Sequence, residues 1–342
     1  MNIKIVYVVV SSVEDIYLEQ AYISMVSVKY YMSNAHIVLL TDRITSETFK
    51  GIRKKESEFA DEIVVVDLDG NKWTALQRSR LLKTSIRNLI DGDFLYIDSD
   101  TIVVCSLDYI EKSEAIIAAC RDGHCDFKDH PVRKLCLDKC LALDWPAEQE
   151  SDYFNGGVMY VKDVPKTHEF FQRWNKNLID GFEKYIMEDQ AALAKTNYEM
   201  GHIITKLPDE WNCQVLRGIR YLKDAYIVHY LCTIPSEYQN KQLFILNEKS
   251  VLLDVKATGK IGKDIMDAIR DPFKGLAEST HTLSGEDVRF INSQYYHFVR
   301  SHYKRDGSSK VLLCLRVMNY GERLVKRYIR ILQGRATLKT AW

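Results

Sequence analysis

The stretch FLYIDSDTI, Phe94–Ile102, decides how this chain is interpreted. Four apolar residues are followed by two aspartates, Asp98 and Asp100, on either side of Ser99. In an open α/β sheet, ligands bind outside the carboxyl ends of the strands. Mg²⁺ and Mn²⁺ prefer oxygen ligands and often share them with a diphosphate. The stretch therefore predicts a buried strand that delivers two carboxylates to a divalent cation, although a turn with two solvated acids has the same composition.

Apolar runs and helix-period segments on both sides of this stretch predict the sheet around it. Strands are expected at Ile3–Val10, His36–Leu40, Glu62–Val66, Phe94–Ile97, Ala115–Ala119, Tyr153–Val161, 202–207 and 226–230. Helices are expected at 15–32, 45–57, 74–90, 164–180 and 188–198, and in most of the chain from about 255. Strands that are apolar throughout and alternate with helices are typical of a parallel sheet covered on both faces.

The composition is that of a globular protein. Of the 342 residues, 46% are apolar and 27% are charged, which excludes disorder, collagen-like repeats and a disulfide-stapled miniprotein. A chain of this length buries most of its apolar surface and needs no metal or disulfide to fold. No apolar run approaches the roughly 18–20 residues that span a bilayer, and Ile3–Val10 is not followed by the cleavage site of a signal peptide. We therefore expect a cytoplasmic protein with reduced cysteines.

Three further segments place polar side chains at the ends of predicted elements. Asn155 and Gly156 precede a buried strand, and glycine permits a ligand to approach the backbone closely. Asp189 and Gln190 lie in the first turn of a predicted helix, and His229 lies at the end of a predicted strand. Each feature also has an ordinary explanation: a turn before a strand, stabilisation of the helix dipole and a structural histidine.

Taken together and in this order, the segments resemble the family-eight retaining glycosyltransferases of the GT-A fold. The resemblance covers roughly residues 3–232 and is carried by Ile3–Val10, Ser79–Lys83, Asp98–Asp100, Ala119–Asp122, Phe154–Val158, Glu188–Gln190 and His229–Tyr230. It implies an α/β fold with a mixed, mostly parallel sheet flanked by helices and a mostly helical C-terminal appendage. We expect the catalytic domain over 1–250, with 122–152 as an acceptor-side excursion, and a helical region with a basic tail over 251–342.

The resemblance also implies an activity. A hexose, glucose or galactose, would pass from a nucleoside diphosphate sugar, with UDP as the expected nucleotide, to a saccharide or glycolipid acceptor. The anomeric configuration would be retained. If the basic tail described below binds membranes, lipopolysaccharide or capsule synthesis is the expected setting. Breaking a sugar–phosphate bond leaves a diphosphate with additional negative charge, which a divalent cation stabilises.

Particular side chains receive roles from the same resemblance. Asp98, Asp100 and His229 would bind Mn²⁺ or Mg²⁺. Asp189 and Gln190 would be catalytic, with the amide of Gln190 nearest to the anomeric carbon. The donor-binding residues expected on this basis are Val8, Ser11, Asp15, Arg80, Lys83, Asp98, Ser99, Asp100, Asp122, Asn155 and Gly156.

The sequence departs from the family at two places that matter for the donor. Val10–Ser12 stand where the family has an acid that binds the uracil, so Asp15 is the expected substitute. His229 is not followed by the glycine and lysine of the family's phosphate clamp. Lys83, Lys241 or the metal alone must then compensate the charge of the diphosphate.

Side chains that bind zinc in other proteins cluster within 21 residues, namely Cys120, His124, Cys125, His130, Cys136 and Cys140. No pair has the C-x-x-C spacing typical of structural zinc sites. Cys136 and Cys140 suit one face of a helix. We prefer reduced thiols in the acceptor-side segment, with a zinc site as the alternative.

Charge is distributed unevenly along a chain that is neutral as a whole. Residues 300–342 carry eleven basic and two acidic side chains, a net charge of +9, so residues 1–299 carry −9. The stretch 310–332 predicts a basic amphipathic helix. Such a helix can lie on anionic lipid, which would make the protein peripheral on the inner face of the cell membrane, or it can dock on the acidic body. A nucleic acid partner is not expected, because no stacking platform accompanies the charge.

Two other classes of function fit parts of the sequence. The DSDTI segment also resembles the first motif of haloacid-dehalogenase-like phosphatases, in which Asp98 would be a nucleophile. Those domains usually begin with that strand, whereas three strand–helix units precede it here. A sugar-nucleotide-binding protein without catalysis fits the missing clamp lysine. Metal-dependent consumption of a nucleotide sugar distinguishes the transferase from both.

Overall fold

The computed structural model describes residues 3–230 and 244–276 and, toward the C-terminus, 289–290, 293–296, 313, 317–318, 320–321, 323–325 and 328–329. The chain divides into two compact units, residues 1–280 and 281–342. The predicted basic helix over 310–332 lies largely outside the described residues. Those of its residues that are described are helical and mostly exposed.

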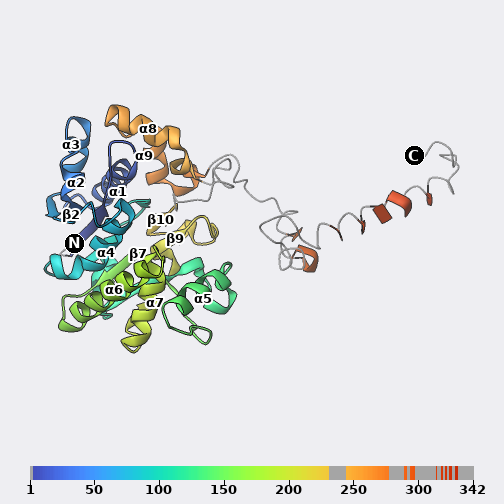
Figure 1. Ribbon diagram of the computed structural model, residues 1–342. Coiled ribbons are helices and arrows are strands. Elements are labelled where there is room, and N and C mark those ends of the chain that lie inside the picture. The colour runs from blue at the N-terminus through green and yellow to red at the C-terminus, as the bar shows by residue number, and fades with distance from the viewer. Residues whose placement is uncertain are drawn as a thin grey trace. The chain divides into compact units, whose positions relative to one another are not determined.

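A seven-stranded sheet forms the centre of the first unit (Figure 1). In order across the sheet, its strands are β3 (Glu62–Val66), β2 (His36–Asp42), β1 (Lys4–Val9), β4 (Phe94–Ile97), β7 (Phe154–Val161), β6 (Ile117–Arg121) and β8 (Ile204–Lys206). Neighbouring strands are parallel except around β7, which runs antiparallel to both β4 and β6. The predicted mixed, mostly parallel sheet is confirmed.

Three short strands form a second, smaller sheet. Its strands, in order, are β5 (Thr101–Val103), β10 (Ile227–His229) and β9 (Cys213–Gln214). β10 is antiparallel to β5 and parallel to β9. Only residues 98–100 separate β4 from β5, so the chain passes from one sheet to the other at the two aspartates. Of this sheet, the sequence predicted only the strand at 226–230.

Helices lie on both sides of the large sheet. They are α1 (Tyr17–Tyr31), α2 (Arg43–Ser46), α3 (Ile52–Ser57), α4 (Ala75–Leu89), α5 (Arg133–Ala142), α6 (Pro165–Glu183), α7 (Asp189–Glu199), α8 (Lys249–Thr258) and α9 (Lys263–Arg270). α4, α5, α6 and α7 lie on one side, and α1, α3, α8 and α9 on the other (Figure 1). Short 3-10 helices occupy Asp108–Lys112, Asp122–His124, Phe127–Asp129, Asp209–Asn212, Leu222–Asp224, Ile245–Asn247 and Pro272–Gly275.

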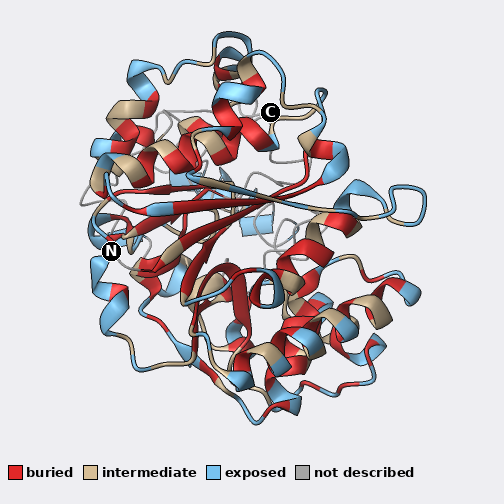
Figure 2. Ribbon diagram, turned by 90° about the vertical axis from the view of Figure 1, so that its left-hand side faces the viewer, coloured by how far each residue is buried: buried red, intermediate tan, exposed pale blue. Residues whose placement is uncertain are grey.

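The central strands are mostly apolar because helices cover both of their faces. In β1, Val6 and Val8 belong to the apolar cluster under α4 and α6, whereas Ile5 and Tyr7 belong to the cluster under α1. Alternate side chains of a strand point to opposite faces, so a strand covered twice needs apolar residues at every position. Figure 2 shows these buried strands between two helical layers.

Two parts of the sequence prediction differ from the structure. The helix predicted over 45–57 is wrong as a single element, because Gly51 between α2 and α3 has φ +58°, a left-handed conformation that does not continue a helix. The segment 122–152, predicted to be irregular, contains the ten-residue helix α5. The boundary predicted at residue 250 falls inside α8, which packs against α1 and α3 in the first unit; the boundary itself stays a prediction. Among the described residues, none of the helices has both the length and the apolar composition that a bilayer crossing requires.

Candidate functional site

The two aspartates of the motif lie in the short connection between β4 and β5. β4 is buried at all four positions, and its end places Asp98 at the carboxyl edge of the large sheet, where α/β proteins bind ligands. The backbone amide of Asp98 donates to the carbonyl oxygen of Gly157 at 2.7 Å. The hydroxyl of Thr101 donates to the carbonyl oxygen of Asp98 at 2.8 Å. The backbone of the connection is therefore held from both neighbouring strands.

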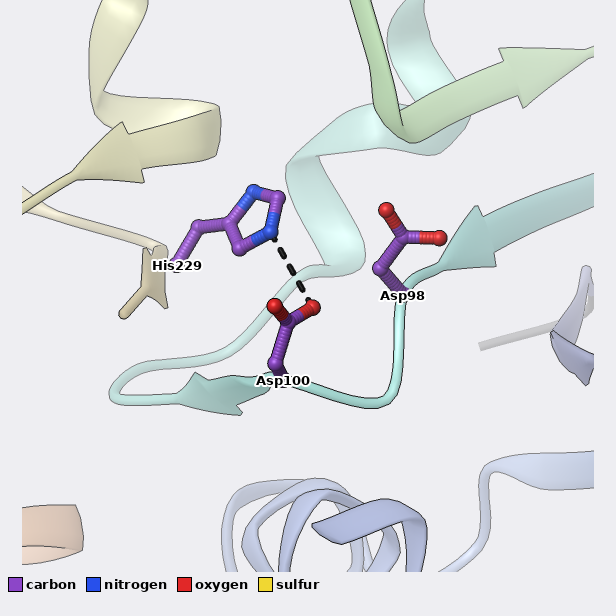
Figure 3. Close-up of side chains that lie close together, drawn as sticks. All are labelled: Asp98, Asp100 and His229. Atoms are coloured by element: carbon purple, nitrogen blue, oxygen red, sulfur yellow. Dashed lines mark hydrogen bonds and ion pairs between the residues drawn. The ribbon is translucent and has the colours of Figure 1, made fainter. Parts of the chain in front are cut away.

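His229 reaches the same place from the second sheet. It ends β10, where it pairs in register with Thr101 of β5. Its Nε2 lies 3.1 Å from an oxygen of Asp100, and the ligand atoms of Asp98, Asp100 and His229 all lie within 4.8 Å of one another. Figure 3 shows the three side chains together. Within the part of the chain that the structure describes, no other three side chains of these types come so close.

The chemistry of this group suits a hard divalent cation. Two carboxylates and one imidazole are a common donor set for Mn²⁺, and carboxylates also suit Mg²⁺. Gly157 leaves the necessary space, because an added Cβ would lie 2.5 Å from Cε1 of His229 and 2.8 Å from Oδ2 of Asp98. Burial alone lowers the pKa of an imidazole, but the adjacent Asp100 outweighs this and raises the pKa of His229. The residues present therefore fit the metal predicted from the sequence.

Two cations and a third carboxylate lie next to the metal-ligand group. Lys83 of α4 is buried, with its Nζ 3.0 Å from Oδ2 of Asp189 and 3.4 Å from Oδ1 of Asp98. Arg80, one turn earlier on α4, has its Nε 3.3 Å from Oδ1 of Asp189. Burial raises the pKa of Asp189, but Lys83 and Arg80 outweigh it and lower the pKa to about 2. Asp189 is therefore ionised at neutral pH.

Asp189 and Gln190 begin α7 at the same edge of the sheet. The Nε2 of Gln190 is buried and has no hydrogen-bond partner among the described residues. Leaving a buried donor unpaired costs about 1–3 kcal/mol. A ligand that accepts a hydrogen bond at this position would remove that cost.

A chain of buried polar side chains joins the site to the 122–152 segment. Oδ1 of Asn155 accepts from the amide of Gly157 and from Nδ2 of Asn212, both at 2.9 Å. Nδ2 of Asn155 donates to Asp122 at 2.9 Å, and the other oxygen of Asp122 lies 2.7 Å from Nε2 of His130. Against the effect of burial, these contacts lower the pKa of Asp122 and raise that of His130 to about 9. At neutral pH the two residues thus form a buried ion pair.

A cavity of about 420 Å³ opens over these groups. Its lining is Val8, Val9, Val10, Asp15, Tyr17, Gln20, Ala75, Leu76, Ser79, Arg80, Lys83, Tyr96, Asp98, Ser99, Asp100, Asn155, Gly156, Gly157, Asp189, Gln190 and His229. Of the predicted site residues, only Ser11 and Asp122 are not among these. Each of these two residues contacts a residue of the lining. The hydroxyl of Ser11 donates to Asp15, and Asp122 accepts from Asn155.

Among the residues that complete the site without being predicted from the sequence are Asn212, His130 and Gln20. Asn212 holds His229, but it lies 17 residues away in the chain and belongs to no motif. His130 was noticed only as part of the cysteine–histidine cluster, and its contact with Asp122 could not be read from the sequence. Gln20 lines the cavity with a buried Nε2 that has no partner among the described residues. A glutamine on the buried face of α1 was the one available signal.

The cysteines of the predicted cysteine–histidine cluster lie in ordinary structural surroundings. Cys120, Cys136 and Cys140 are free thiols. Cys136 and Cys140 are buried in the apolar cluster under α6, while the thiol of Cys120 donates to the carbonyl oxygen of Pro208 at 3.1 Å. Lys241, one of the two candidate cations for the diphosphate, lies outside the described residues.

Several solved structures that resemble this chain are glycosyltransferases. An active-site mutant of LgtC matches with a TM-score of 0.50 and 12% identity, over 79% of this chain and 100% of that one. The galactosyltransferase LgtC with donor and acceptor sugar analogues matches with a TM-score of 0.45 and 13% identity, over 70% and 100%. The bifunctional glycosyltransferase WbbM matches with a TM-score of 0.46 and 17% identity, over 67% of this chain and only 45% of WbbM.

The first of these likenesses, together with the sheet described above, shows the fold. The GT-A fold expected from the sequence is confirmed: a mixed, mostly parallel sheet flanked by helices. No family model matches the chain, and a comparison with curated proteins finds no match.

Proposed function

We propose that the chain is a metal-assisted glycosyltransferase of the family-eight type. It would transfer a hexose from a nucleoside diphosphate sugar to a saccharide or glycolipid acceptor with retention of the anomeric configuration. The observation that carries the proposal is the meeting of Asp98, Asp100 and His229 within 4.8 Å, in a cavity that also contains Asp189 and Gln190. The GT-A fold supports it independently.

The charges around the cavity support a divalent cation as part of the donor site. The lining contains four carboxylates and two cations, namely Asp15, Asp98, Asp100, Asp189, Arg80 and Lys83. With His229 neutral, these sum to a net charge of −2, which repels a diphosphate. A divalent cation, when bound, cancels this charge and stabilises the diphosphate as a leaving group. Nucleotide binding should therefore require the metal.

The chain's own residues would have distinct tasks. Because Arg80 and Lys83 keep Asp189 ionised, Asp189 would accept hydrogen bonds from sugar hydroxyls and would not donate a proton at neutral pH. The amide of Gln190 is a weak nucleophile, so we assign it to stabilising the oxocarbenium-like sugar. Retention would follow from attack of the acceptor hydroxyl on the face that the diphosphate leaves.

Lys83 is the cation that we assign to the diphosphate in place of the missing clamp lysine. It lines the cavity and contacts Asp98, one of the proposed metal ligands. Asp15 and Tyr17 also line the cavity, and the backbone amide of Tyr17 donates to Oδ1 of Asp15 at 3.2 Å. We assign these residues to the nucleoside, with UDP as the nucleotide.

We also propose that the basic tail over 310–332 brings the enzyme to anionic lipid, where a lipid-linked acceptor of lipopolysaccharide or capsule synthesis would be found. Each basic residue near such a surface contributes about 1 kcal/mol. In a co-sedimentation assay, the full-length protein should pellet with anionic vesicles and not with neutral ones. Protein that stays in the supernatant with both would remove the membrane from the proposal.

A thermal-shift panel of nucleotide sugars with and without Mn²⁺ tests the function. A ligand at 100 times its Kd stabilises the folded state by about 2.7 kcal/mol, which raises the Tm by about 4 °C in a protein of this size. We expect this shift with UDP-hexoses only when Mn²⁺ is present, followed by UDP release with an acceptor. Phosphate release from a phosphomonoester would indicate a phosphatase instead, and donor binding without turnover would indicate a non-catalytic protein.

A further inference from the structure

We infer that Asn212 is a positioning residue that selects the tautomer of His229 and thereby sets the metal affinity of the site. The inference rests on the proposed function, because it takes Asp98, Asp100 and His229 as ligands of a divalent cation. Asn212 is fully buried. It ends the 3-10 helix Asp209–Asn212 and directly precedes β9.

One backbone donor determines how both asparagines of the network are oriented. The N–H of Gly157 can only donate, and it lies 2.9 Å from a terminal atom of Asn155, so that atom must be the oxygen. The other terminal atom of Asn155 is then the nitrogen, and it donates to the carboxylate of Asp122 at 2.9 Å. Since the oxygen of Asn155 accepts, the atom of Asn212 that lies 2.9 Å from it must be Nδ2.

This orientation turns the carbonyl oxygen of Asn212 toward His229. Oδ1 of Asn212 lies 3.0 Å from Nδ1 of His229. A carbonyl oxygen only accepts, so Nδ1 must carry the hydrogen. Nε2, on the opposite side of the ring, faces an oxygen of Asp100 at 3.1 Å in Figure 3, which also only accepts, so without a cation Nε2 carries a hydrogen too. Because Nδ1–H stays bonded to Asn212, Nε2 is the nitrogen that would lose its hydrogen and offer its lone pair to a cation. The backbone of β7 thus determines, through two asparagines, which nitrogen of His229 binds metal.

The strand that follows Asn212 is anchored on both sides. β9 pairs with β10 so that Gln214 lies opposite His229. The side chain of Gln214 accepts from the amide of Gly123 and donates to the carbonyl oxygen of Arg121, both at 2.9 Å. The backbone carbonyl oxygen of Asn212 lies 2.8 Å from Nε2 of His124. Asn212 is therefore fixed relative to His229 before any ligand binds.

Two substitutions separate the tautomer role from packing. Asn212→Ala removes the acceptor for His229 and the donor for Asn155. Asn212→Asp keeps an acceptor for Nδ1–H of His229 but cannot donate to Asn155. Losing the hydrogen-bond partner of a metal-binding histidine weakens metal affinity by about 10–100-fold, and a carboxylate is a common natural partner for such a ring. Asn197→Ala is the matched control, because Asn197 is also buried but accepts from the amide of Ile204 in β8.

The experiment titrates Mn²⁺ alone into the full-length chain and its variants, with free Mn²⁺ counted by electron paramagnetic resonance and folding checked by thermal melts. We expect Asn212→Ala to bind Mn²⁺ about 10–100-fold more weakly, while Asn212→Asp and Asn197→Ala stay within about threefold of wild type. If Asn212→Ala does not fold, Asn212→Leu takes its place in the comparison.

Wild-type affinity in Asn212→Ala would overturn the inference. Equal losses of Mn²⁺ affinity in Asn212→Ala and Asn212→Asp would also overturn it, because they would show that Asn212 acts only through packing. Both outcomes leave the proposed function intact, because they require that wild type binds Mn²⁺. A wild-type chain that binds no Mn²⁺ would instead remove the proposed metal site and this inference with it.

Discussion

Replacing Gly157 by alanine should damage the metal site while leaving the fold in place. The added Cβ would lie 2.5 Å from Cε1 of His229, 2.8 Å from Oδ2 of Asp98 and 2.9 Å from Oδ1 of Asn155. Packed carbon atoms keep about 3.5–4.0 Å apart, so the imidazole or the β7 backbone must move by roughly 1 Å. Either movement separates His229 from the two carboxylates that the proposed metal needs.

The size of the effect follows from that displacement. A misplacement of about 1 Å can lower a catalytic rate by roughly 100-fold, which is about 2.7 kcal/mol of transition-state stabilisation. Overpacking the strand should also cost about 1–3 kcal/mol of stability. Gly156→Ala is the matched control, since its added Cβ would come no closer than 3.4 Å, to Nζ of the flexible Lys83.

The assay compares Mn²⁺ affinity and kcat/KM for both glycine variants and wild type, at a temperature where thermal melts show all three folded. We expect the Mn²⁺ affinity of Gly157→Ala to fall by at least about tenfold and that of Gly156→Ala to stay close to wild type. Wild-type Mn²⁺ affinity in folded Gly157→Ala would refute the ligand geometry, and equal losses in the two variants would show that any side chain in this turn is harmful.

Gln190→Ala and Asp189→Asn should each lower donor turnover by roughly 100-fold in a UDP-release assay; wild-type rates in both would remove these residues from the mechanism. Because the pKa of Asp189 is lowered to about 2, its pairing stabilises the fold above the usual aspartate pKa of about 3.9 and is lost as pH falls through about 2. The stability difference between wild type and Asp189→Asn should therefore shrink on acidification, and a constant difference would contradict the pairing. The pKa of His130 is raised to about 9, so its pair with Asp122 is fully present below about 6.5 and is lost as pH rises through about 9. Urea denaturation should show a difference between wild type and His130→Gln that is larger at pH 6 than at pH 10, and the reverse order would contradict it. Lys83→Met should weaken UDP binding in the presence of Mn²⁺ by at least about tenfold by calorimetry, and unchanged affinity would assign the diphosphate charge to another cation.

The large sheet could be predicted because its physical cause is local. Strands covered on both faces must be apolar at nearly every position, and β4 and the five residues of β1 after Lys4 show this in the sequence without any knowledge of their neighbours. The second sheet could not be predicted in the same way. β5 and β9 have three and two residues, too few to show any periodicity.

Some residues of the site could likewise be predicted from the sequence, and others could not. Asp98 and Asp100 could be predicted because they follow an apolar strand, where α/β folds bind ligands, whereas the metal role of His229 was expected only from the family resemblance. Asn212 was not, because its role depends on contacts with Asn155 and His229 that only the folded chain creates. The buried pairing of Asp122 with His130 is likewise a tertiary contact, across a segment whose helix, α5, was itself not predicted.

Diffraction at the manganese absorption edge, from crystals of the full-length protein grown with Mn²⁺ and UDP, tests the central claim most directly. We predict one anomalous peak within bonding distance of the carboxylate oxygens of Asp98 and Asp100 and of Nε2 of His229, with the diphosphate on its open side. Bound UDP without that peak, or a peak elsewhere while the two carboxylates turn away from the cavity, would contradict the account.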